Sequence, residues 1–173
     1  MKRRTVARVI VLNALFQIEL GGIDIINAEE NALYSIDDEV LEALYPEFKN
    51  KRQKFLAEKI KIQDYMAEPE FRSFITMLIN GIRRCSDEFD KKIESRLQNW
   101  NFDRVGKVEK NILKIALFEM FYVDDVPHSV SIEQAVTLAG IFSTSDAGKF
   151  VNGILGAIYK EEIDNGGKKA EKA

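Results

Sequence analysis

The sequence predicts an all-α fold, a helical bundle of about seven helices. Residues 112–121 are almost continuously apolar and rich in helix formers, without the strict alternation of a half-buried strand. Residues 147–158 carry apolar side chains at helical spacing, and glycines or prolines separate such stretches elsewhere. No segment is a convincing strand. A first set of helices, including the N-terminal one, is therefore expected to pack against three C-terminal helices.

Three helices with short connections are predicted at the C-terminal end. The segment 112–121 has only Lys114 and Glu119 as polar residues, so we expect a helix with neighbours on most sides. It should end near Asp124 and Asp125, because Pro127 disfavours helical geometry at the preceding residue.

The next two helices are predicted from capping residues. Ser131 and Gln134 have the spacing of a capping box, which predicts a helix that starts at Ser131. The run 143–146 offers caps for the last helix. Gly153 and Gly156 lie inside that helix at a cost of about 1 kcal/mol each, which suggests a neighbouring backbone close by. Its apolar face consists of Ala147, Phe150, Val151, Ile154, Leu155 and Ile158.

The N-terminal helix is predicted from about Thr5 to Leu20, ended by Gly21 and Gly22. Its start carries a cluster of cations, Lys2, Arg3, Arg4 and Arg8. Positive charge at a helix start opposes the helix dipole, so a phosphate ligand explains the cluster better than solubility alone.

Residues 23–67 separate charge along the chain. Nine acidic residues and no lysine or arginine occur from Val9 to Phe48, and six cations follow between Lys49 and Lys61. Apolar spacing suggests a short helix at 36–48 and a basic helix at 55–66. The basic helix could bind RNA, although a solvated surface is the commoner outcome for such a face.

Two further helices are expected between residues 69 and 100. Pro69 suits a first helical turn, and Cys85 continues an apolar face, so a packed thiol is expected. Ser86 or Asp87 should cap the next helix, with Trp100 as a core anchor at its end. Residues 1–163 are expected to form the folded domain, and residues 164–173 a disordered tail.

Composition argues against catalysis. The chain has one cysteine and one histidine, so a disulfide, a cysteine-rich zinc site or a histidine-based metal site is not expected. His128 is interpreted as a turn residue that faces solvent. No phosphate-binding glycine loop or dinucleotide motif occurs. We expect no catalytic residues, no metal and no cofactor, and no membrane span in a cytoplasmic protein.

Four segments in order resemble the NusB family of transcription antitermination factors: the arginine-rich start leading into NALFQIEL, then GKVEKNILKIALFEM, DVPHSVSIEQAVTLA and KFVNGILG. Residues 23–67 depart from the family by being longer than the usual connection. The resemblance implies two three-helix subdomains packed together. It also implies binding of boxA RNA jointly with NusE, a small-subunit ribosomal protein, in an RNA polymerase antitermination complex that reads through terminators in ribosomal RNA operons.

The resemblance also implies site residues. By position, the family's RNA-binding surface corresponds to Lys2, Arg3, Arg4 and Arg8 together with Asp146, Lys149 and Phe150. Periodicity alone would place Phe150 in the core. Phe16 and Glu109 match positions that contact NusE, and Phe16 replaces a tyrosine found in some members.

Two other functions remain open at this point. One is a helical protein–protein adaptor that binds through its acidic face and does not contact RNA. The other is an RNA-binding domain related to ribosomal RNA cytosine methyltransferases, although no Rossmann-like region or catalytic cysteine pair is present. The resemblance also leaves open a homodimer that hides the RNA surface.

Overall fold

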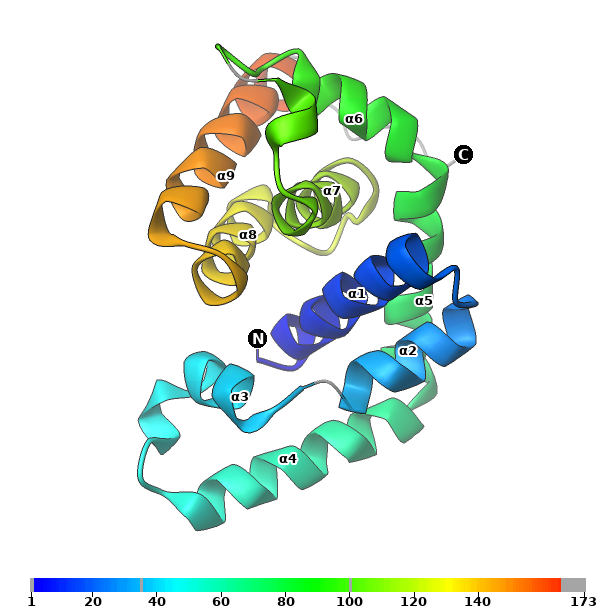
Figure 1. The fold of residues 1–173 in the computed structure, drawn as a ribbon, viewed down its shortest axis with the longest axis vertical. Helices are drawn as coiled ribbons and strands as arrows, with labels where there is room; N and C mark the ends of the chain where they lie inside the picture. Colours follow the sequence, from blue (N-terminus) through cyan, green and yellow to red (C-terminus); the bar gives the residue numbers. More distant parts are fainter. Residues whose placement is uncertain (1, 35, 100, 166–173) are drawn as a thin grey trace. The chain divides into compact units, whose positions relative to one another are not determined.

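Helices alone form the regular structure of residues 2–34, 36–99 and 101–165, which are the residues described by a computed structural model (Figure 1). These residues contain nine α-helices and no strand, so the all-α prediction is confirmed. The chain divides into two compact units, Met1–Ile79 and Asn80–Ala173, and each is described by itself. No helix in the described residues is long and apolar enough to cross a bilayer.

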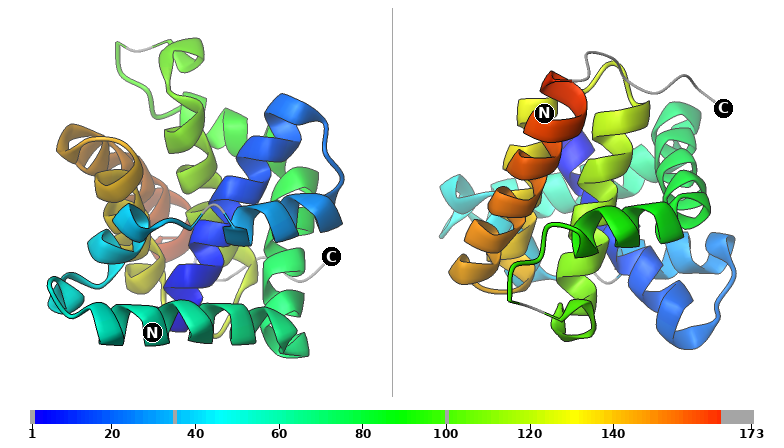
Figure 2. Two further views of the ribbon diagram at one scale, coloured as in Figure 1. Left: turned by 60° about the horizontal axis from the view of Figure 1, so that its bottom comes forward. Right: turned by 90° about the horizontal axis from the view of Figure 1, so that it is seen from above.

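Unit 1 is organised around its N-terminal helix. It contains α1 (Lys2–Gly21), α2 (Ile25–Tyr34), α3 (Asp38–Leu44), α4 (Arg52–Ala67) and most of α5 (Pro69–Arg84). Helix α1 is almost wholly buried from Val6 to Leu12 and contacts α2 and α4 (Figure 2, left). Its predicted end is confirmed: Gly22 has a φ of +62°, and its N–H donates to the carbonyl of Ile18 at 3.1 Å.

The segment 23–67 forms three α-helices, where the sequence predicted two. Helix α2 was missed because its buried side chains are small: Ala28 and Ala32 are fully buried, and apolar spacing gives small residues little weight. Its buried Glu29 accepts a hydrogen bond from the Thr76 hydroxyl at 2.8 Å. Helix α3 starts where the Asp37 carboxylate accepts the backbone N–H of Val40 at 2.9 Å.

Unit 2 surrounds a central helix, α7 (Lys107–Tyr122), with α6 (Ser86–Glu94), α8 (His128–Phe142) and α9 (Ser145–Ile158). Figure 2 (right) shows α7 and α9 side by side. Every residue of α7 from Asn111 to Phe121 is buried, which confirms the predicted helix with neighbours on most sides.

The two charged residues of that stretch, Lys114 and Glu119, are buried as well, and each has a partner. The Lys114 ammonium lies 2.9 Å from Asp90 Oδ1 and donates to the Ser86 hydroxyl at 2.8 Å. The Glu119 carboxylate accepts a hydrogen bond from the Ser131 hydroxyl at 2.9 Å. Paired in this way, buried charges can be accommodated in the core.

Two predictions about α8 are wrong. The helix begins at His128, after Pro127, so Ser131 lies within it and does not cap it. Ser131 instead donates a hydrogen bond from its hydroxyl to Glu119 on the preceding helix, α7. His128 does not face solvent: it is half-buried, its Nε2 lies 3.1 Å from the carbonyl oxygen of Met120, and its ring centroid lies 5.3 Å from that of Tyr159.

The predicted start of α9 is confirmed, but the interpretation of its glycines is wrong. Thr144 is the N-cap, and its side-chain oxygen accepts the backbone N–H of Ala147 at 3.1 Å. Among the described residues, a Cβ built on Gly153 or Gly156 would meet nothing within 4 Å, so none of their backbone approaches closely there. A Cβ on Gly148 would lie 3.5 Å from the Val136 side chain, an ordinary contact.

Helix α6 is shorter than predicted. Its N-cap residue is Cys85, one position before the expected cap, and it ends at Glu94. Trp100, predicted as a core anchor, lies outside the described residues, as do residues 166–173 of the predicted tail. Asp164, also assigned to the tail, still belongs to a helical turn, Tyr159–Asp164.

Candidate nucleic-acid interface

The start of α1 holds arginines against aromatic rings. The Arg3 guanidinium lies over Tyr65 at the end of α4, 5.1 Å from the ring centroid, and over Phe71 of α5 at 5.5 Å. It also forms an ion pair with Glu68, in which both side chains are nearly half exposed, 41% and 46%. A guanidinium stacked on aromatic rings has a fixed orientation, which favours recognition of a phosphate or a stacked base.

The other predicted cations of this helix differ in accessibility. Arg4 is half-buried and lies over the Phe74 ring, 5.0 Å from its centroid. Arg8 is only 3% exposed. The side chain of Lys2 lies outside the described residues. The first turn of α1 contains no acidic residue. Among the described side chains of the predicted cluster, Arg3 and Arg4 are those that reach solvent.

A cleft of about 270 Å³ in unit 2 collects three of the predicted site residues. It lies between the loop before α7, the first turn of α7 and the first two turns of α9. The structure thus brings together Glu109, assigned to NusE, with Asp146 and Phe150, assigned to RNA. Lys149 is exposed on α9 but does not line the cleft. The lining residues are Arg104, Val105, Gly106, Glu109, Thr144, Asp146, Ala147 and Phe150.

Glu109 is fixed from two sides. Its Oε1 accepts a hydrogen bond from the Ser143 hydroxyl, in the turn between α8 and α9. Its Oε2 lies against Gly106, where a Cβ would collide with the carboxylate. Glycine at position 106 therefore leaves room for Glu109 to lie back over the start of its own helix.

The cleft also contains residues that sequence reasoning missed. Arg104 supplies a cation to the cleft that Glu109 and Asp146 also line, and Thr144, predicted only as a cap, lines it as well. The sequence feature that could have indicated Arg104 is its position in DRVG, at the start of the GKVEK segment. Of the remaining predicted residues, Phe16 is half-buried on α1 in unit 1. Phe150, Arg104 and Asp146 can supply an aromatic face, one cation and one carboxylate acceptor, the groups that bind the face and edges of an unpaired base.

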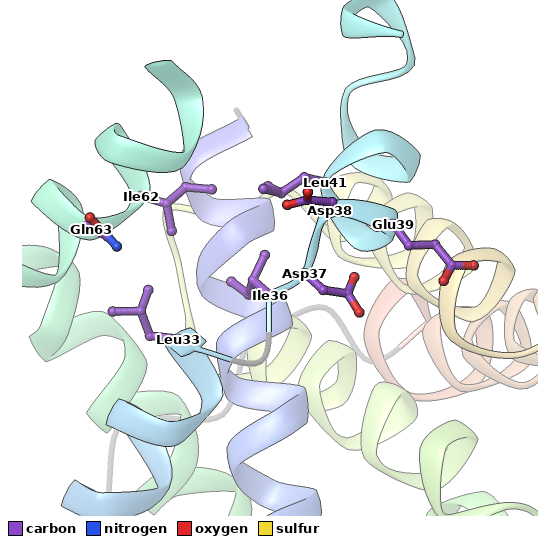
Figure 3. Close-up of a pocket in the computed structure, with 8 residues that line it drawn as sticks. All are labelled: Leu33, Ile36, Asp37, Asp38, Glu39, Leu41, Ile62 and Gln63. Carbon is purple, nitrogen blue, oxygen red and sulfur yellow. The ribbon is translucent and has the colours of Figure 1, made fainter. Parts of the chain in front are cut away.

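A second hollow, of about 530 Å³, lies in unit 1 among α2, α3 and α4 (Figure 3). Its floor is apolar, and its rim carries three carboxylates, Asp37, Asp38 and Glu39. These carboxylates would repel phosphate, so this hollow does not suit RNA. In the part of the chain that the structure describes, no group of three or more histidine, cysteine or carboxylate side chains is arranged so that it could hold a metal ion.

Comparison with known proteins identifies the family of this chain. The sequence profile of the NusB family matches residues 5–160. The transcription antitermination protein NusB of Chloroherpeton thalassium is 35% identical over 127 residues, which cover 73% of this chain and 60% of that protein. The chain therefore aligns with less than two thirds of that relative's length.

Solved structures resemble this fold over nearly their whole length. NusB of T. maritima superposes with a TM-score of 0.65 at 27% identity, covering 93% of this chain and 92% of that one. NusB in a crystal structure with NusE and double-stranded RNA gives a TM-score of 0.64 at 24% identity, covering 92% and 98%. The latter likeness concerns the fold alone. The profile match spans most of the chain, and the protein belongs to the NusB family.

Proposed function

We propose that this protein is a transcription antitermination factor that binds boxA RNA together with NusE and supports read-through by RNA polymerase in ribosomal RNA operons. The observation that carries this proposal is the family match over residues 5–160, which includes α1 from Thr5 and the whole cleft of unit 2. The relative from Chloroherpeton thalassium bears the name transcription antitermination protein. The role is noncatalytic, needs no cofactor and is carried out in the cytoplasm, where transcripts are made.

In this proposal the cations at the start of α1 bind RNA phosphates. Arg3 and Arg4 reach solvent and carry most of this contact, with Lys2 next to them and Arg8 reinforcing the positive field from its buried position. Arginine binds phosphate through paired N–H donors, and stacking on Tyr65 holds the Arg3 donors in a fixed plane.

In unit 2, the first turns of α9 supply RNA contacts of their own. Phe150 offers an aromatic face for a base, Asp146 an acceptor for base N–H groups, and Lys149 a cation for the adjoining phosphate. Glu109 and Phe16 bind NusE. Because Phe16 has no hydroxyl, its contribution is apolar contact alone.

Read-through measured in a transcription extract tests the proposal. The extract is depleted of its own NusB and given a template with boxA ahead of a terminator. Adding this protein with NusE should increase the fraction of full-length transcript. A template with scrambled boxA should show no increase. Equal read-through on both templates, or no increase on either, would overturn the proposed function.

A protein adaptor without RNA contact is the second candidate, and two observations favour it. Arg3 is already paired with Glu68, and Arg8 is buried, so part of the cationic cluster is occupied. Measuring NusE affinity with and without boxA RNA separates the candidates. Two ligands that bind cooperatively must each raise the affinity of the other by the same factor, whereas an adaptor shows no such linkage.

A further inference from the structure

Helix α4 carries lysines on the face that ends at the Arg3 contact. Positions 54, 58, 61 and 65 are spaced by four, three and four residues, so they form one stripe along the helix. Tyr65 closes this stripe and lies under the Arg3 guanidinium at 5.1 Å. Lys54 and Lys61 lie farther along the stripe, and both are exposed. With a rise of about 1.5 Å per residue, the stripe is about 16 Å long.

The charges around this stripe favour one path for an RNA strand. The turn before α4 and its first residues add three more exposed cations, Lys49, Lys51 and Arg52. The rim of the neighbouring hollow is acidic, so it repels phosphate (Figure 3). An RNA strand that continues from Arg3 is therefore attracted along α4 and repelled toward α3. Position 58, a glutamate, is the one acidic position of the stripe.

We propose that α4 is a second RNA-binding surface, which holds the phosphates of single-stranded RNA flanking boxA on the Lys54–Lys61–Tyr65 stripe. The proposal rests on the proposed function, because the stripe continues from Arg3. It assigns a role to helix α4, which lies in the segment 23–67. The contact is to the backbone, so it lengthens the RNA footprint without adding sequence preference.

RNA length separates this surface from the boxA site. The probes are a short boxA RNA and the same RNA extended on both sides, and both are titrated against the full chain with NusE across a range of salt concentrations. For single strands, each phosphate contact adds about 0.7 to the slope of log affinity against log salt, which corresponds to about fivefold in affinity at 0.1 M salt. The wild-type protein should bind the extended RNA more tightly and with a steeper slope.

Three variants test which residues cause the difference. A K54Q/K61Q variant should bind the extended RNA about 25-fold more weakly than wild type, with unchanged affinity for the short RNA. Glu58→Gln should act in the opposite direction and strengthen binding of the extended RNA by up to about fivefold. The matched control, K91Q/K160Q, removes the same charge from exposed lysines of unit 2 and should leave the affinity for both RNAs unchanged. Thermal melting checks that each variant is folded.

Each failure has a separate meaning. If the short RNA binds as expected but the extended RNA binds no more tightly, the stripe does not bind RNA and the proposed function still stands. The same holds if K54Q/K61Q changes the affinity for the two RNAs no more than K91Q/K160Q does. If neither RNA binds with or without NusE, the proposed function fails, and the role of α4 fails with it.

Discussion

Replacing Glu68 with glutamine should strengthen RNA binding. Glu68 forms an ion pair with Arg3, the guanidinium that lies over Tyr65 and Phe71 at the start of α1. A phosphate that binds Arg3 must compete with this carboxylate. Removing the negative charge of Glu68 frees the guanidinium while leaving its aromatic contacts in place.

The structure bounds the size of this effect. The side chains of Arg3 and Glu68 are 41% and 46% exposed, and ion pairs exposed to this degree contribute about 0–1 kcal/mol. If the whole pair is lost when RNA binds, Glu68→Gln raises RNA affinity by at most about fivefold, since a tenfold change corresponds to about 1.4 kcal/mol. The same figure limits the loss of folding stability to about 1 kcal/mol.

Fluorescence polarisation with labelled boxA RNA measures the change, and Glu70→Gln is the control. Glu70 is exposed two residues farther along α5 and forms no ion pair in the described residues. Its substitution reports the general effect of removing one negative charge from this region. Affinity should rise more for Glu68→Gln than for Glu70→Gln. Equal changes, or weaker binding by Glu68→Gln, would refute a role for Arg3 at the phosphate.

Three predictions concern folding, and urea denaturation of each variant measures the free energy of unfolding that tests them. Asp90→Ala should lower the free energy of unfolding by about 2–3 kcal/mol, because it strips the carboxylate from buried Lys114, and a loss below about 0.5 kcal/mol would contradict the pairing. Ser131→Ala should cost about 1.5–3 kcal/mol by removing the donor to buried Glu119, whereas an unchanged midpoint would mean that the bond contributes nothing. Gly153→Ala should raise the free energy of unfolding by about 0.5–1 kcal/mol, since Gly153 lies within α9 and its new Cβ would meet no neighbouring atom among the described residues. Destabilisation would disprove that geometry.

Elements with a strong local signal could be predicted from the sequence. The apolar run 112–121 allowed one interpretation, a helix covered on most sides, because few polar residues interrupt it. The end of α1 followed from Gly22, whose positive φ suits glycine, and the start of α9 followed from Thr144. In each case the deciding physics acts within a few residues of the chain.

The errors arose where a distant partner decides the outcome. Ser131 has the spacing of a capping residue, yet its hydroxyl binds buried Glu119 on α7. His128 follows a turn, yet its ring contacts Tyr159 at the end of α9. Neither partner can be identified from local spacing. Arg104 was missed for the same reason, because only the fold brings it into the same cleft as residues of the first turn of α9.

Linked binding of boxA RNA and NusE tests the proposed function most directly. A short boxA RNA and a scrambled RNA are each titrated with this protein at moderate salt, with and without NusE. BoxA RNA should bind more tightly when NusE is present, and the affinity for the scrambled RNA should change little. Equal, weak binding of both RNAs, unaffected by NusE, would mean that this chain keeps the NusB fold without the function proposed for it.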